Sequence, residues 1–124
     1  MKAIRKALQS RLESLHARVY FQTAPDNAAY PYLVYDITSV FSDGEGHETA
    51  AIDVDGWDFN DTRNTTVIED LMTTVNTGLN KYSTSNEDIS VFVTLENKIP
   101  LTDPDKRIHR RKYTYEVKIF KLKE

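Results

Sequence analysis

The sequence predicts a single α+β domain, residues 1–124, in which a mostly antiparallel sheet of four strands, or slightly more, carries two helices on one face. Three observations lead to this fold class. The chain has the length of one domain. Two segments repeat apolar residues at helical spacing, and four segments have the alternation or the β-branched and aromatic content of strands. Their order is helix, two strands, helix, two strands, and placing both helices on one sheet face buries every apolar stripe.

The first element is an amphipathic helix over about Met1–Ala17, whose second face carries lysine, arginine and glutamate. Its apolar residues recur at helical spacing: Ile4, Leu8, Leu12 and Leu15. A short extended segment, Arg18–Phe21, follows it. Pro25 with Asp26 and Asn27 then predicts a turn, because these residue types stabilise tight turns.

A long β-hairpin is predicted next. Its first strand, Tyr32–Phe41, has the apolar content of a strand with both faces partly covered. The acidic segment Asp43–Glu48 contains two glycines and predicts an exposed loop, which we expect to be mobile in a free subunit because it has little to bury. The second strand, Ala50–Phe59, alternates between apolar and polar residues. Gly56 beside Trp57 indicates a bulge in this strand.

The second helix is predicted to begin at about Thr62. Asn60, Asp61 or Thr62 can cap it by accepting hydrogen bonds from its free N–H groups. Gly78 and Asn80 are signals for its end. Its apolar stripe consists of Ile68, Leu71, Met72, Val75 and Leu79.

Two further strands are predicted to complete the sheet. Tyr82–Glu87 is interpreted as a polar loop, Asp88–Glu96 as an alternating strand, and Asn97–Asp105, which contains two prolines, as a loop. The longest strand is Ile108–Leu122. Its inward-facing residues are Tyr113, Tyr115, Val117 and Ile119, and its outward-facing residues are Arg110, Lys112, Thr114, Glu116 and Lys118.

Charge is segregated along the chain although the formal net charge is only −3. The segment from Asp36 to Asp70 contains ten acids and one base, whereas the segment from Lys106 to Lys123 contains eight bases and one acid. A separation of this kind bears on association with partners more than on fold.

Catalytic and metal-binding chemistry has few candidates in this chain. Cysteine is absent, which removes disulfides, thiolate ligands and a thiol nucleophile. Asp53 and Asp55 project from one strand face and can serve as an acid–base pair or hold Mg²⁺. A solvated strand face, or cross-strand ion pairs with Arg110 and Lys112, is the preferred explanation. A flexible loop supports metal ligands poorly, and the second candidate is such a loop, with Asp43, Glu45, His47 and Glu48. We therefore expect no enzyme, no cofactor and no resident metal.

Nucleic acid and membrane are the other partner classes to consider. The basic segment Lys106–Lys112 can neutralise phosphates, which makes a nucleic-acid-binding module the alternative of a different class, although the acidic remainder of the chain opposes it. No run of about 18 apolar residues is present, so we expect no membrane partner. The charged amphipathic N-terminus does not have the pattern of a secretory signal.

Several features in a fixed order resemble one protein family over nearly the whole chain. After the leading helix these are Arg18-Val-Tyr20, Pro25, Pro31-Tyr-Leu-Val-Tyr35, Asp53-Val-Asp-Gly-Trp57 with a helix after it, and a long final strand. This arrangement resembles the small tail completion (tail-to-head joining) proteins of long-tailed bacteriophages. The resemblance implies a structural virion protein without catalytic residues. Such a subunit forms a ring with copies of itself, six by family resemblance, caps the head-proximal end of the tail tube and docks it to the head connector. It implies tail tube and head connector proteins as partners and a location in the virion, after assembly in the host cytoplasm. A head–tail connector adaptor or a tail terminator of similar fold is the alternative.

A ring requires heterologous contacts between two different patches. The acidic and basic segments are candidate patches, and complementary charge there would mainly speed encounter and set the register. Two readings stay open: the charges join neighbouring subunits, or they lie in one sheet and neutralise each other within the monomer. The candidate assembly residues are Asp43, Glu45, His47, Glu48, Asp53 and Asp55 on the acidic side, and Arg107, Arg110, Arg111 and Lys112 on the basic side.

Overall fold

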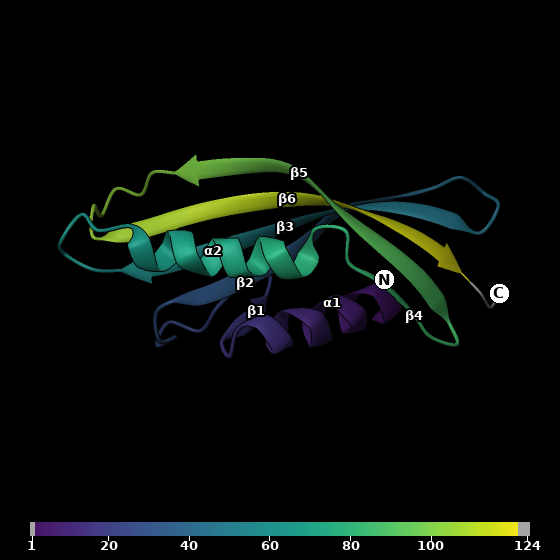
Figure 1. Cartoon of the computed structure of the whole chain (residues 1–124), viewed down its shortest axis with the longest axis horizontal. Helices are drawn as coiled ribbons and strands as arrows, with labels where there is room; N and C mark the ends of the chain where they lie inside the picture. The colour runs from purple at the N-terminus through teal and green to yellow at the C-terminus, as the bar shows by residue number, and fades with distance from the viewer. Residues whose placement is uncertain (1, 122–124) are drawn as a thin grey trace.

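A computed structural model describes residues 2–121 and shows an α+β fold with two helices and one mixed sheet of six strands (Figure 1). The strand order across the sheet is β1-β2-β3-β6-β5-β4. The elements in chain order are α1 (Lys2–Leu15), β1 (Val19–Phe21), β2 (Tyr32–Ser42), β3 (His47–Phe59), α2 (Thr66–Leu79), β4 (Ser83–Ser85), β5 (Ile89–Leu101) and β6 (Ile108–Lys121).

The prediction of a mostly antiparallel sheet of four strands, or slightly more, is correct for the four central strands, but it did not place the two short edge strands. β1 pairs with β2 in parallel, and β4 pairs with Ser90–Phe92 of β5. Each edge strand has three residues, too few to show a strand period in the sequence. Backbone hydrogen bonds hold β1 in place, because Leu33 N donates to Arg18 O and Gln22 N donates to Tyr35 O. The expected loop over Tyr82–Glu87 therefore contains a strand.

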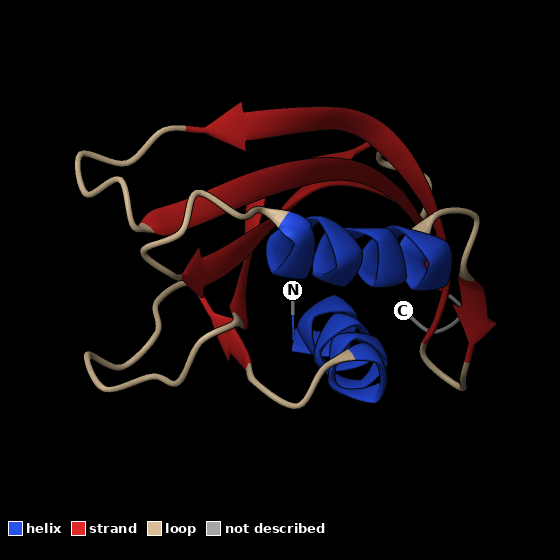
Figure 2. Cartoon of the chain, turned by 60° about the vertical axis from the view of Figure 1, so that its left-hand side comes forward, coloured by secondary structure: helices blue, strands red, loops and turns tan. Residues whose placement is uncertain are grey.

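Both helices lie on one face of the sheet, as predicted, and the sheet curls around them (Figure 2). The predicted stripes of the two helices and the inward residues of β3 and β6 all join one core cluster. α1 ends at Leu15 rather than Ala17, while Met1 and Leu122, the expected ends of the first helix and last strand, lie outside the described residues. The core includes Leu12, Leu33, Tyr35, Ile52, Val54, Ile68, Met72, Val75, Tyr115 and Val117.

The start of α2 differs from the prediction by four residues. The helix begins at Thr66, and its N-cap residue Thr65 makes no side-chain capping hydrogen bond. Instead, the Oδ1 atom of Asn64 accepts from the backbone N–H of Thr66 at 2.9 Å. Asn60 stabilises the preceding turn, where its Oδ1 accepts from the backbone N–H of Thr62 at 3.2 Å. Asn60 and Asn64 each accept a backbone hydrogen bond from the residue two positions later. The prediction placed the helix start after the first of them, whereas the helix starts after the second.

The predicted loop over Asn97–Asp105 is wrong in its first half. β5 continues to Leu101 after a bulge between Leu95 and Asn97, and Pro100 lies opposite Arg111 of β6. Since β4 pairs only with Ser90–Phe92, this half of β5 borders no further strand within residues 2–121. An edge position tolerates proline because no ladder hydrogen bond is needed there.

Gly56 does not mark a bulge. The irregular positions in the ladders of β2 and β5 fall between Ile37 and Ser39 and between Leu95 and Asn97, whereas Gly56 pairs regularly with Leu33 and with Arg111. A Cβ atom at Gly56 would lie 2.6 Å from the Sδ atom of Met72. The glycine therefore lets α2 approach the sheet closely.

Candidate assembly surface

The convex face of the sheet, opposite the helices, carries Asp53, Asp55, Arg110 and Lys112, which are four of the ten candidate residues that the sequence singled out. Side chains alternate along β3 and β6, so the odd-numbered residues from 53 to 57 and the even-numbered residues from 110 to 114 share this face. β3 and β6 are direct neighbours, with Asp53 opposite Thr114, Asp55 opposite Lys112 and Trp57 opposite Arg110. Acidic and basic residues that are 55 to 59 positions apart in the chain therefore meet.

These charges pair within the monomer. Lys112 Nζ lies 3.9 Å from Asp53 Oδ2, and Arg110 Nη2 lies 3.8 Å from Asp55 Oδ2. The hydroxyl of Thr114 also donates to Asp53 Oδ1 at 3.1 Å. For these residues, the structure matches the hypothesis that the acidic and basic segments lie in one sheet and neutralise each other within the monomer. A role for them between subunits stays a proposal.

Arg110 and Arg111 point to opposite sides of the sheet. Arg111 lies on the helix side, where its Nε donates to Glu69 Oε1 of α2 at 2.6 Å. This contact ties the start of α2 to β6. The basic segment is thus divided between two faces and does not form one continuous phosphate-binding strip.

The acidic loop is shorter than predicted, because His47 and Glu48 belong to β3. His47 Nδ1 lies 3.0 Å from Asp43 Oδ2, and Asp43 Oδ1 accepts from the backbone N–H of Glu45 at 2.7 Å. The backbone N–H groups of Glu45 and then His47 lower the pKa of Asp43. Glu48 forms an ion pair with Lys121, whose Nζ lies 3.2 Å from Glu48 Oε1. Within the described residues, no three acidic or histidine side chains gather as metal ligands would.

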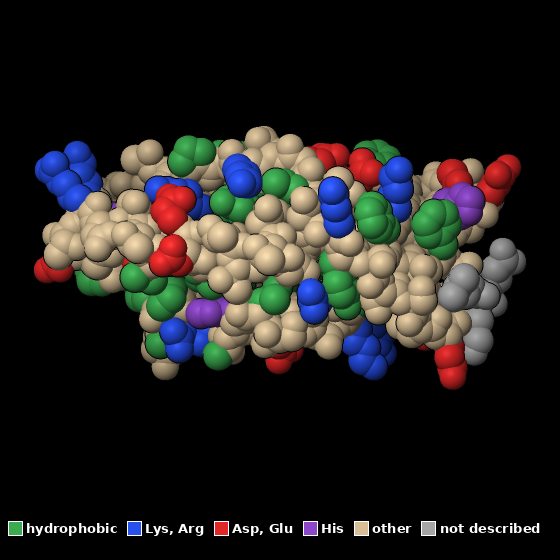
Figure 3. Space-filling model, in the orientation of Figure 1, with side chains coloured by type: hydrophobic (Ala, Val, Ile, Leu, Met, Phe, Trp, Pro, Cys, Tyr) green, Lys and Arg blue, Asp and Glu red, His purple; other side chains and the backbone are tan. Residues whose placement is uncertain are grey.

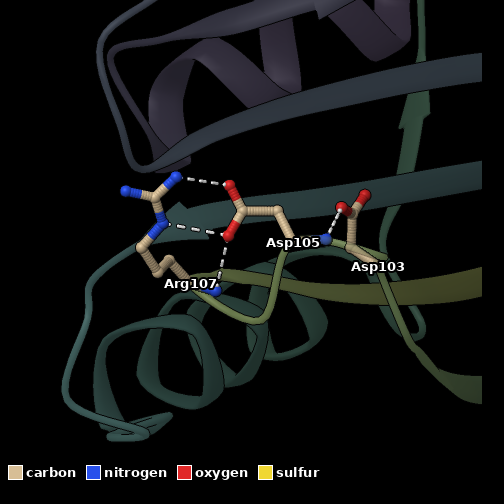
Figure 4. Close-up of polar contacts among 3 residues, drawn as sticks. All are labelled: Asp103, Asp105 and Arg107. Carbon is tan, nitrogen blue, oxygen red and sulfur yellow. Dashed lines mark hydrogen bonds and ion pairs between the residues drawn. The ribbon is translucent and has the colours of Figure 1, made fainter.

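Arg107 lies in the turn that leads into β6 and is held by Asp105 (Figure 4). Its Nε and Nη2 donate to the two carboxylate oxygens of Asp105 at 3.0 and 2.9 Å, and its backbone N–H donates to the same carboxylate. These bonds, led by the side-chain one, lower the pKa of Asp105 to about 2. The turn is therefore built by a local ion pair.

We expect the carboxyl of Asp105 to titrate near pH 2 in a carbon-detected NMR titration. Because its folded pKa lies below the ordinary value of 3.8, the stability that it contributes is complete above pH 3.8 and is lost as the pH falls toward 2. Arg107→Gln should raise the midpoint part of the way, since one backbone donor remains. Lys106→Gln removes an equal charge and is the control. An equal change in both variants would mean that the general field of the basic segment, rather than the bidentate bond, lowers the pKa.

An aromatic cluster occupies one end of the convex face. The ring of Tyr32 stacks beside that of Trp57 with an interplanar angle of 11°, and the guanidinium carbon of Arg110 lies 3.8 Å from the Trp57 ring centroid. Tyr30 contacts both Tyr32 and Phe59. Burial raises the pKa of Tyr32 to about 12, so its hydroxyl stays protonated at physiological pH.

A shallow depression of about 370 Å³ opens beside this cluster. Asp55 lies in its wall, and burial raises the pKa of that carboxyl against the opposing effects of Lys112 and Arg110. Sequence reasoning missed the depression, although the period of two in β2 and β3 placed several of its residues on one face. Its lining residues are Gln22, Thr23, Ala24, Tyr32, Val34, Asp55, Trp57 and Arg110.

A second feature that sequence reasoning missed lies toward the other end of the convex face. Phe41 of β2 is 69% exposed, and Phe92 of β5 and Phe120 of β6 are each 41% exposed. Phe41, Thr49, Lys118 and Phe92 follow one another across four strands in one register row. We call Phe41, Phe92 and Phe120 the phenylalanine patch. In the view of Figure 3, hydrophobic side chains occur in small groups between charged and polar atoms.

Comparison with known proteins identifies the fold. No protein-family model and no curated protein sequence matches the chain. Among solved structures, the chain is similar to one in the virion of a native gene transfer agent (GTA) particle, with a TM-score of 0.60 and 14% sequence identity. The match covers 91% of this chain and 84% of the other. No helix within residues 2–121 is long and apolar enough to cross a membrane. At this identity, the likeness shows that the two chains share a fold.

Proposed function

We propose that this chain is a structural virion protein, namely a tail completion or tail-to-head joining subunit. In this role it caps the head-proximal end of the tail tube, docks the tube to the head connector, and acts without catalysis. The observation that carries the proposal is the shared fold with a virion chain over 91% of the sequence. The order of sequence features that resembles tail completion proteins supports it independently. A connector adaptor or tail terminator is the alternative, and the position of the chain in a reconstruction of the particle separates the two.

The phenylalanine patch supports assembly with other protein chains. Phe41 and Phe92 lie in one register row with Thr49 and Lys118 between them, and Phe120 is two residues from Lys118 on β6. Large apolar side chains left exposed on one sheet face are candidates for a contact surface. Most of the charged candidate residues are already paired inside the monomer, which leaves the patch as the stronger source of binding free energy. The exposed Glu45 and the ion-paired Asp43 and Arg107 are proposed to contribute at the rim of contacts between copies in a ring.

Deleting the coding sequence from the element that carries it tests the proposal. We expect filled heads and tails that remain separate in electron micrographs, and a supplied wild-type copy should restore joined particles. Phe41→Ser should reduce the number of joined particles by at least about tenfold, which corresponds to the loss of one central apolar contact. Val67→Ser is the matched control, since Val67 is also exposed, at 48%, but lies on α2 at the opposite face. Normal particles after deletion, with no peptide of the chain in purified virions, would refute the function.

A further inference from the structure

The depression beside the aromatic cluster gathers polar atoms that lack partners. Three buried side-chain atoms have no hydrogen-bond partner among residues 2–121, namely Asp55 Oδ1, Trp57 Nε1 and Arg110 Nε. All three residues line the same depression. A buried polar atom without a partner loses its hydrogen bond to water without replacement, and native proteins therefore contain few of them. Their concentration at one place indicates a binding site whose occupant completes the hydrogen bonds.

The types of these atoms define the occupant. Trp57 Nε1 and Arg110 Nε are donors, whereas Asp55 Oδ1 is an acceptor. A cation would meet two donors and the positive charge of Arg110, and an anion would meet the carboxylate of Asp55. A neutral primary amide, as in an asparagine or glutamine side chain, has a carbonyl oxygen and an N–H group on the same edge, so it can satisfy both kinds of atom. The register supports this geometry, because Trp57 and Arg110 lie opposite each other and Asp55 is two residues from Trp57 on the same face.

We propose that the depression binds the primary amide of an asparagine or glutamine side chain on a protein partner. The carbonyl of the amide accepts from Trp57 Nε1 and Arg110 Nε, and its N–H donates to Asp55 Oδ1. This site extends the proposed contact surface but does not depend on a virion role, because it rests only on the atoms that line the depression.

A nucleic-acid base fits the depression less well than a protein amide. Bases bind proteins largely by stacking on open aromatic faces. Here the guanidinium of Arg110 covers the Trp57 ring at 3.8 Å, and Tyr32, stacked beside Trp57, is only 9% exposed. The two aromatic rings that line the depression are therefore already covered, whereas a small amide reaches the site without stacking.

The test uses the full-length, ¹⁵N-labelled protein and small probes. Trp57 is the single tryptophan of the chain, so its indole N–H gives one resonance. We expect acetamide, which carries a primary amide, to shift the Trp57 indole and Arg110 Nε–H resonances in a saturable way. Sodium acetate and methylammonium chloride, at equal ionic strength, should give no saturable shift.

Matched variants locate the response. Asp55→Leu should abolish saturation by acetamide, while Asp55→Asn, which keeps an acceptor oxygen, should retain it. Asp53→Leu is the control, because Asp53 lies on the same strand face but does not line the depression. The remaining resonances report whether each variant is folded. Equal responses to all three probes, or equal loss in Asp53→Leu and Asp55→Leu, would overturn the proposal. The absence of any response would also overturn it, since it would mean that Asp55 turns onto Arg110 and closes the site.

Discussion

Replacing Gly56 with alanine is expected to lower the free energy of unfolding by roughly 1–3 kcal/mol, the usual cost of overpacking a core. The added Cβ would lie 2.6 Å from Met72 Sδ and 2.8 Å from Ile68 Cδ1. Both side chains are fully buried, so neither can move into solvent. The substitution therefore acts on the contact between β3 and α2.

A double-mutant cycle tests this explanation by urea denaturation. Met72→Ala alone is expected to cost roughly 2–5 kcal/mol because it leaves a cavity. The double variant Gly56→Ala with Met72→Ala should cost less than the two single effects together, by about 0.5–3 kcal/mol, since the new methyl group enters that cavity. Leu79→Ala, also buried but about 10 Å further along α2, should combine additively with Gly56→Ala. If the costs of Gly56→Ala and Met72→Ala were also additive, the Met72 side chain would not be the group that excludes a Cβ atom at Gly56.

Replacing Arg110 with glutamate is expected to destabilise the monomer by roughly 2–4 kcal/mol, somewhat below the cost of breaking a fully buried ion pair. The Arg110 and Asp55 side chains are only 22% and 18% exposed, and the guanidinium also covers the ring of Trp57. A second carboxylate would then face Asp55 in a site where burial already raises the pKa of that carboxyl. Arg111→Glu should cost less than about 1 kcal/mol, because its partner Glu69 is 48% exposed.

The effect of Arg110→Glu should depend on pH. The pKa of Asp55 is raised in the folded state, so folding disfavours the ionised carboxylate. The destabilisation that this carboxylate causes is therefore present above that pKa and disappears as the pH falls below it. Urea midpoints for the variant should therefore approach those of the wild type in acid. Asp55→Lys combined with Arg110→Glu should recover part of the loss at neutral pH. A destabilisation that is equal at every pH would assign the loss to packing on Trp57 instead of to charge.

This prediction changes how an assembly experiment must be designed. Exchanging Arg110 and Arg111 for glutamate disturbs two contacts inside the monomer before any subunit contact is reached. Loss of assembly in that variant would not identify an interface. Phe41 is the better position, because its side chain is largely exposed and its loss leaves the core cluster intact.

Periodicity by itself determined the two helices, the faces of the long strands and most of the core. The stripe from Ile68 to Leu79 and the alternation from Ala50 to Phe59 arise because one side of each element is buried. These patterns can therefore be recognised without knowing which elements pack against them. The same alternation placed Asp53 and Asp55 on one face and Arg110 with Lys112 on another strand's outward face. The resemblance to tail completion proteins likewise came from the order of these elements.

Only the tertiary structure decided which strands are neighbours and what their side chains meet. A period of two assigns a residue to a face but carries no information on strand order, so the pairing of β3 with β6, and with it the internal ion pairs, could not be read from the sequence. β1 and β4 are too short to show a period, and Pro100 fits β5 because β4 stops before it. The unpartnered atoms of Asp55, Trp57 and Arg110 come from two strands far apart in the chain, and only their packing brings them to one depression.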